Sequence, residues 1–158
     1  MDLFRTIAFL PVVVLLACQG KPGEQPAQTA AGPSLQKIAI HDRAEADSLL
    51  KAGFDLLVIE DTYVVARVEP AEHTKIASMN LKATRAEESD LIQRLVKIPL
   101  DETHGVQPLV DLGMDVWQVK QDTVIAQAYD KYIREATEKG YQVLVVAKNV
   151  QEVAAKKN

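Results

Sequence analysis

Histidine, cysteine and acidic residues are the side chains through which this chain could do chemistry. The histidines are His41, His73 and His104, and no two of them stand at a spacing that would put two metal ligands on one face of a helix or strand. The glycines occur singly, so the sequence contains neither a phosphate-binding loop nor a nucleophile elbow. We therefore predict no catalytic residue, no metal site and no cofactor.

The acidic residues favour structural roles. Glu87-Glu88 and Asp101-Glu102 fall at expected turns and helix starts, where a carboxylate interacts favourably with the helix dipole. Asp55 and Asp115 each come two residues after a glycine that is expected to end a helix. An aspartate at such a place typically caps the turn into the next strand, so we expect a cap rather than an acid/base group.

Composition narrows the classes of partner. The chain has 158 residues, is 47% hydrophobic and 25% charged, and carries a formal net charge of −4. These values are typical of a globular protein. No basic cluster is longer than Lys156-Lys157, so we predict no nucleic-acid partner. The single cysteine, Cys18, excludes an intrachain disulfide.

The amino-terminal segment is typical of a secretory signal. Residues 7–17 form an apolar run of 11 residues that follows Arg5. That is about half of the roughly 20 residues that a membrane-spanning helix needs, so residues 1–17 are predicted to be a signal peptide.

The end of this run, Leu15-Leu16-Ala17-Cys18, resembles the lipobox of bacterial lipoproteins. The resemblance implies cleavage after Ala17, acylation of Cys18 and the lipid bilayer as a partner. Gln19 follows where an Asp would signal inner-membrane retention in enterobacteria, so the resemblance favours the outer membrane of a bacterial cell envelope. The alternative is an ordinary signal peptide followed by a buried cysteine.

Residues 18–34 have too little apolar surface to fold. The segment from Gln19 to Ser34 holds three prolines and three glycines, and its other residues are small or polar. Such a composition does not offset the entropy lost on ordering. We expect the lipidated cysteine to begin a flexible tether.

The rest of the chain repeats with an offset of 60 residues, which indicates a duplication into units 35–93 and 94–158. Identical residues align without a gap at Lys37/Lys97, Ile38/Ile98, Leu49/Leu109, Gly53/Gly113, Asp55/Asp115, Val64/Val124 and Ala66/Ala126. Strands are predicted at 35–41, 55–60, 63–69, 81–86, 94–100, 115–120, 123–129 and 141–147, and helices at 44–53, 70–79, 104–113 and 130–139. Gly53, Gly113, Asn80 and Gly140 are expected to close the helices with a positive φ.

Each unit therefore has the order strand, helix, strand, strand, helix, strand, which is the order of a ferredoxin-like fold. The predicted fold class is α+β, with two tandem ferredoxin-like repeats and antiparallel sheets after the signal peptide and tether.

Alternation along the strands assigns the faces of the sheets. The face toward the helices is predicted to hold Leu57, Ile59, Val64, Ala66 and Val68 in the first unit, and Trp117, Val119, Val124, Ala126, Val143 and Val145 in the second. The opposite, open face is predicted to hold Leu56, Val58 and Val65, and then Val116, Ile125, Leu144 and Val146. These open faces are less polar than a solvated sheet. We expect the two sheets to pack on each other, or each face to pack on a second copy of the chain as in a homodimer; the alternative is that a few valines are simply exposed.

A second resemblance involves the run L-V-D-L-G-M-D-V-W at 109–117 and the run V-L-V-V-A-K-N-V-Q-E-V at 143–153. Both are similar to segments in the activation peptides of zinc metallocarboxypeptidases, which are ferredoxin-like and block the enzyme's cleft. No peptidase domain follows in this sequence and the unit is doubled, so the resemblance implies docking to another protein in trans. The hairpin at Lys120, Gln121 and Asp122 matches the region that faces the enzyme in that family.

The sequence thus predicts a non-enzymatic, lipid-anchored envelope protein that binds another envelope or secreted protein. Two alternatives remain open: an inhibitor or chaperone of a secreted zinc peptidase, and a small-ligand-binding lipoprotein or envelope spacer. The predicted partner-binding residues are Lys120, Gln121, Asp122, Val116, Ile125, Leu144 and Val146.

Overall fold

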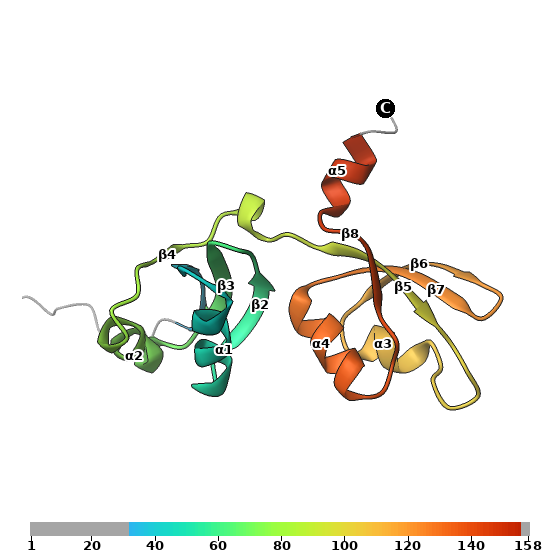
Figure 1. Cartoon of the computed structure of the whole chain (residues 1–158), viewed down its shortest axis with the longest axis horizontal. Coiled ribbons are helices and arrows are strands. Elements are labelled where there is room, and N and C mark those ends of the chain that lie inside the picture. The colour runs from blue at the N-terminus through green and yellow to red at the C-terminus, as the bar shows by residue number, and fades with distance from the viewer. Residues whose placement is uncertain (1–31, 156–158) are drawn as a thin grey trace, which may run out of the picture.

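The computed structural model describes residues 32–155, which form two α+β units connected in tandem (Figure 1). Each unit contains one four-stranded sheet whose strand pairs are all antiparallel. The predicted α+β class with two antiparallel sheets is confirmed. The predicted signal peptide, the cleavage site at Ala17, the lipidated Cys18 and the tether as far as residue 31 lie outside the described residues. The predicted end of the tether is one residue too late, because Ser34 already belongs to the first strand.

The first unit has the sheet order β2-β3-β1-β4. Its elements are β1 (Ser34–Ala39), α1 (Arg43–Lys51), β2 (Asp55–Ile59), β3 (Tyr63–Val68), the 3₁₀ turn η1 (Pro70–Glu72), α2 (His73–Ser78) and β4 (Ala83–Arg85). A linker with the short 3₁₀ turn η2 (Glu88–Asp90) leads to the second unit.

The second unit has the equivalent order β6-β7-β5-β8. Its elements are β5 (Arg94–Pro99), α3 (Gln107–Asp111), β6 (Asp115–Lys120), β7 (Thr123–Ala128), α4 (Asp130–Glu138) and β8 (Leu144–Ala147), followed by α5 (Val150–Ala155). The sequence analysis did not predict the helix α5. The helix α3 is shorter than the helix expected at 104–113, because Asp101, Thr103 and His104 form a turn instead.

The turns that end the helices follow the sequence prediction. Gly53, Gly113 and Gly140 have φ values of 88°, 101° and 94°, and Asn80 has a φ of 58°. Glycine adopts this left-handed conformation without steric cost, and asparagine tolerates it better than most residues. These four positions therefore fix where helices end and strands begin.

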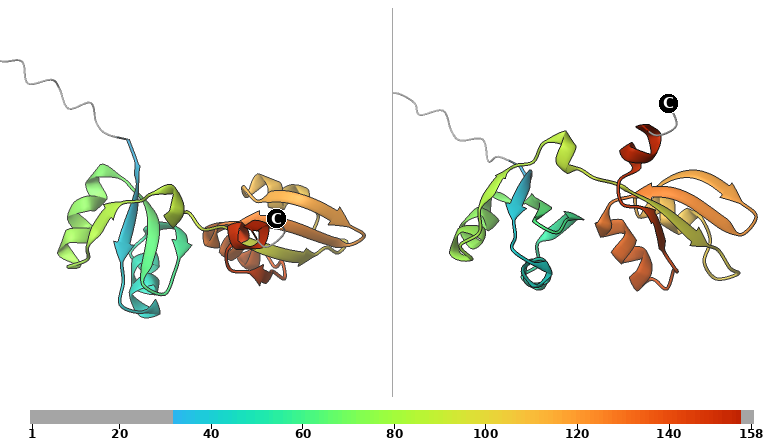
Figure 2. Two further views of the ribbon diagram at one scale, coloured as in Figure 1. Left: turned by 90° about the horizontal axis from the view of Figure 1, so that it is seen from above. Right: turned by 45° about the horizontal axis from the view of Figure 1, so that its top comes forward.

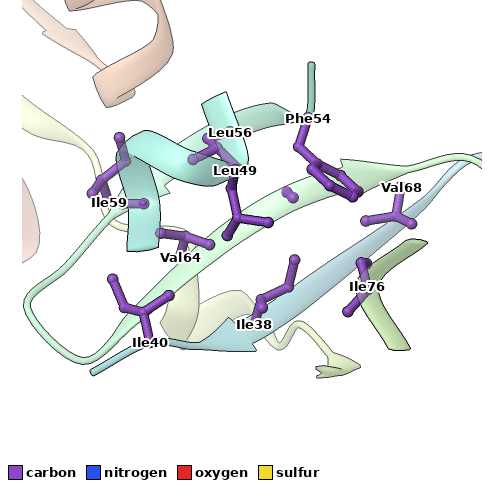
Figure 3. Packing of buried hydrophobic residues seen from close by; sticks show 11 residues of the cluster. Ile38, Ile40, Leu49, Phe54, Leu56, Ile59, Val64, Val68 and Ile76 are labelled. Atoms are coloured by element: carbon purple, nitrogen blue, oxygen red, sulfur yellow. The ribbon is translucent and has the colours of Figure 1, made fainter. Parts of the chain in front are cut away.

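The core of each unit lies between its sheet and its helices. In the first unit Leu49 of α1 and Ile76 of α2 pack on Ile38, Val64 and Val68 of the sheet (Figure 3). The second core is built in the same way around Leu109, Val96, Ile98 and Val124, each of which is fully buried.

The alternation prediction is wrong for Leu56 and Leu57 in β2 and for Val116 and Trp117 in β6, because each strand contains a β-bulge at the same place; Val58 and Ile59 lie on the predicted faces. Leu56 pairs with Ala66 and Val58 with Val65, so Leu57 is an additional residue; Trp117 is the additional residue in β6. The bulge reverses the expected faces only at the additional residue and at the residue before it. Leu56 and Val116 pack on the helix side, whereas Leu57 lies on the open side with Val58 and Val65, and Trp117 is 51% exposed.

Two other valines predicted to face the helices are only partly covered. Val119 and Val145 are opposite the core residues Val124 and Val96, but they lie in the edge strands β6 and β8 and are 49% and 44% exposed. The predicted packing of the two sheets on each other is also wrong. The two units lie side by side, and the main contact between them is α4 against β2 (Figure 1).

Candidate interaction surface

The open face of the first sheet is covered by the chain itself. Leu57, Val58 and Val65 form a buried cluster, and the linker residues Leu91 and Ile92 pack against it. Tyr129, from the second unit, also packs on this cluster. The apolar part of this face is therefore buried, whereas Arg67 and Thr84 of the same face are exposed.

A polar contact attaches the linker to this face. Lys37 Nζ lies 2.6 Å from Asp90 Oδ1 and 4.3 Å from the centre of the Tyr63 ring. The hydrogen bond from Lys37 lowers the pKa of Asp90, and the same bond raises the pKa of Lys37. Both shifts favour the charged pair at neutral pH.

The open face of the second sheet is uncovered within the part of the chain that the structure describes. One row of side chains crosses the four strands, because Gln118 pairs with Ile125, Ile125 with Lys97, and Lys97 with Leu144. Leu144 is 63% exposed, and the neighbouring Val146 is 53% exposed.

Trp117 is held on this open face by polar contacts. Its indole Nε1 donates to Asp115 Oδ2 over 3.2 Å, and the Gln127 side-chain amide donates to the same oxygen over 2.7 Å. Asp115 therefore orients the indole instead of capping a turn. Trp117 on the edge strand β6, and Leu144 and Val146 on the opposite edge strand β8, are exposed apolar side chains of one sheet face, which is typical of a protein-binding surface.

The structure places most of the predicted partner-binding residues on or beside this face. Ile125 and Leu144 belong to the row of side chains that crosses the sheet, and Val146 is the additional residue where the β5–β8 pairing shifts. Lys120, Gln121 and Asp122 are exposed at the tip of the β6–β7 hairpin, which points away from the first unit (Figure 2). Val116 was predicted wrongly, since it packs on the helix side.

The two units are joined by a buried arginine. The Arg94 side chain donates to both carboxylate oxygens of Asp130, at 3.0 Å from Nε and 2.8 Å from Nη2, and Nη1 lies 2.7 Å from Glu60 Oε1. It also donates to the carbonyl oxygens of Ile59 and Lys148. Burial lowers the pKa of Arg94, but Asp130 and Glu60 outweigh burial, so its pKa is raised and it stays charged.

A second ion pair supports this junction. Lys131 Nζ lies 2.8 Å from Asp55 Oδ1, so Asp55 joins the units rather than capping the turn before β2. Sequence reasoning missed the junction. A signal was present in the repeat: Ser34 and Pro70 stand at the positions equivalent to Arg94 and Asp130, so these charges belong to the second unit alone.

His104 and its neighbours come nearest to a catalytic arrangement. His104 Nδ1 lies 2.9 Å from Thr103 Oγ1 and 2.9 Å from Asp101 Oδ1. Thr103 Oγ1 and Asp101 Oδ1 are thus both within hydrogen-bond distance of the same ring nitrogen, Nδ1. Among the described residues no nucleophilic side chain forms a hydrogen bond with the other ring nitrogen, Nε2. The hydrogen bonds from Thr103 and His104 lower the pKa of Asp101, so this carboxylate is a stable turn acceptor.

Two other kinds of site are absent from the described residues. Among residues 32–155 no group of three or more His, Cys, Asp or Glu side chains is arranged to hold a metal ion. Within the same range, no helix is both long and apolar enough to cross a membrane.

No family model, curated protein or solved structure gives a significant match to this chain. Its function is therefore inferred from its own residues and from the surfaces they form.

Proposed function

We propose that this chain is a non-catalytic, lipid-anchored protein of the bacterial cell envelope, and that the open face of its second sheet binds another envelope or secreted protein. The observation that carries the proposal is the exposure of Trp117, Leu144 and Val146 on one sheet face. The equivalent face of the first unit is buried by the linker and Tyr129. Trp117 lies on one edge strand of this face and Leu144 and Val146 on the other, so a protein that covers the whole face would bury all three.

We further propose that both units are ferredoxin-like repeats that arose by duplication. The common strand order and the bulge at Leu57 and at Trp117 support this proposal. A bulge reproduced at a 60-residue offset is a detail that duplication explains directly, because bulges are kept within families.

The anchor is proposed from Leu15-Leu16-Ala17-Cys18. Several acyl chains on Cys18 would hold the protein stably at a bilayer, whereas a single chain binds only marginally. In a bacterial host, Cys18→Ser should abolish the incorporation of labelled palmitate and shift the protein out of the membrane fraction. A wild-type chain that incorporates no label would refute the lipid anchor, but it would not affect the proposal that the open face binds another protein.

The binding surface can be tested by site-specific crosslinking in cells. A photoreactive amino acid at position 117 or 144 of the full chain should crosslink to one recurrent envelope protein. Position 110 supplies the matched control, because Val110 is 45% exposed but belongs to α3 on the helix side.

The pattern of crosslinks decides the outcome. The same partner captured from positions 117 and 144, but not from 110, supports the proposal. Equal capture from all three positions, or none from 117 and 144, would contradict it.

The hairpin supports a second candidate, an inhibitor or chaperone of a secreted zinc peptidase. Lys120 and Asp122 are exposed at the hairpin tip, and Gln121 between them has a φ of 54°, which gives the tip a tight turn. This is the region that the activation-peptide resemblance assigns to the enzyme contact. This candidate predicts that the protein at micromolar concentration inhibits a zinc carboxypeptidase, and that the double variant Lys120→Ala, Asp122→Ala relieves the inhibition. The absence of inhibition when the protein is in excess over the enzyme would exclude this candidate.

A further inference from the structure

We propose that the edge strand β6 pairs with β6 of a second copy of the chain, in antiparallel orientation about a two-fold axis. This inference goes beyond the proposed function, because it concerns the edge of the second sheet and holds whatever protein its open face binds.

The first unit shows how such an edge is satisfied. Ile59 lies in the edge strand β2; its N–H donates to Asp130 Oδ2 over 2.8 Å, and its carbonyl oxygen accepts from Arg94 Nη2 over 3.1 Å. The backbone groups of Ile59 therefore point out of the sheet and are bonded by the second unit.

The equivalent edge of the second unit has no such partner among the described residues. Val119 pairs with Val124 as Ile59 pairs with Val64, so its N–H and carbonyl point outward in the same way. Within residues 32–155 no other element bonds to these two groups. An edge strand with free backbone groups is a template for another strand.

The contact that covers β2 cannot be repeated on β6 by the first unit of another copy. The residues equivalent to Arg94, Asp130 and Lys131 are Ser34, Pro70 and Ala71, which supply neither a guanidinium nor a carboxylate nor an ammonium group. The second unit's own Arg94 and Asp130 are already engaged with β2. Head-to-tail association in this mode is therefore excluded.

The residues of β6 are instead complementary to themselves. Hydrogen-bonded and non-hydrogen-bonded pairs alternate along an antiparallel ladder. Val119/Val124 is a non-hydrogen-bonded pair, so the next pair, Gln118/Ile125, is hydrogen-bonded and the one after it, Val116/Ala126, is again non-hydrogen-bonded. Val116 is therefore the next residue of β6 whose backbone N–H and carbonyl point out of the sheet. Val119 can thus exchange hydrogen bonds with Val116 of a second copy.

This register places opposite charges together. When Val119 faces Val116 of the second copy, Asp115 faces Lys120 of that copy, and the two-fold axis repeats the pair. Side-chain faces agree as well, because Asp115 and Lys120 share the open face whereas Val116 and Val119 share the helix face. A slip by one residue would bring apolar and charged side chains to the wrong faces.

The resulting dimer would have one continuous sheet. The axis is perpendicular to the sheet, so both open faces, each with Trp117 and Leu144, lie on the same side. A pair of six-residue strands buries little surface compared with a stable interface. We therefore expect weak association in dilute solution and stronger association where both copies are held at one surface.

Charge reversal provides the test. In Lys120→Asp the strand pair would bring aspartates together, and in Asp115→Lys it would bring lysines together. In a mixed dimer of the two variants both pairs regain opposite charges. Full-length chains with two different carboxyl-terminal tags are co-expressed, and the co-purified fraction is measured in mild detergent.

The wild-type chain should co-purify with itself, each variant should do so about tenfold less, and the two variants co-expressed should recover most of the wild-type level. Lys82→Asp makes the same charge change in the first unit and should leave co-purification unchanged. The recovery also shows that neither variant has lost its fold.

Two results overturn the proposal. A wild-type chain that never co-purifies with itself would show that the bulge and charges of β6 prevent this edge strand from pairing with another strand. Variants that co-purify as well as wild type, or whose mixture does no better than either alone, would exclude this strand pair. Neither result affects capture of another protein at position 117 or 144, so failure here is distinguishable from failure of the proposed function.

Discussion

The two open sheet faces have the same backbone and different surroundings. In the first unit the bulge residue Leu57 is 4% exposed and lies under the linker and Tyr129. In the second unit the bulge residue Trp117 is 51% exposed. The first unit is therefore completed by the linker and the second unit, whereas within the described residues the second unit has no equivalent cover.

The largest effect should come from breaking the junction at Arg94. Arg94→Ala removes the buried cation and leaves Asp130 and Glu60 facing each other without it. Removing one member of a buried ion pair costs about 3 to 5 kcal/mol, and this loss should appear in urea unfolding followed by circular dichroism. Arg85→Ala, at an exposed position in β4, is the control. A loss below about 1 kcal/mol would mean that the junction is not what joins the units.

The next effect compares the two bulge residues directly. Leu57→Ala should cost about 2 to 3 kcal/mol, because it opens a cavity in a closed cluster. Trp117→Ala should cost less than about 1 kcal/mol, because the indole is half exposed. Urea unfolding of both variants measures the difference, and equal losses would show that both faces are covered.

This difference between the faces was only partly predictable from the sequence. Gly53, Gly113, Asn80 and Gly140 located the helix ends correctly, because positive φ restricts the residue type. The bulges were not predictable, since Leu57 and Trp117 carry no residue signal for an additional position in a strand. One inserted residue then reversed the assigned face of Leu56 and Val116.

The junction shows a different limit of sequence reasoning. Arg94, Asp130 and Glu60 are far apart in the chain, and only the folded structure brings them together. In the sequence alone these three residues cannot be distinguished from ordinary charged residues on the surface. The lack of equivalent charges at Ser34 and Pro70 was the one available signal.

A smaller effect on the pH dependence of stability should come from the ion pair between Lys37 and Asp90, which the equivalent Lys97 lacks within residues 32–155. Because the pKa of Asp90 is lowered in the folded state, the Lys37–Asp90 pair adds stability above the unfolded pKa of an aspartate, about 3.9. That contribution is lost as the pH falls through the lower folded pKa. Asp90→Asn should therefore reduce stability at neutral pH and flatten its decline in acid, as measured by thermal unfolding from neutral to acidic pH.

Lys97 provides the matched comparison. It lies at the same position of the second sheet, is exposed and forms no ion pair within residues 32–155. Lys97→Gln should leave the pH profile unchanged. An acid profile of Asp90→Asn that is identical to wild type would show that the linker contact adds nothing to stability.

Fluorescence of the chain's single tryptophan is the sharpest check that the second sheet has an uncovered face. A dilute chain from Gly32 onward should show red-shifted emission from Trp117 and efficient quenching by acrylamide, because half of the side chain is exposed. Blue-shifted emission that resists quenching at every dilution would place the indole in the core, as simple strand alternation predicts, and an open second face would then be ruled out.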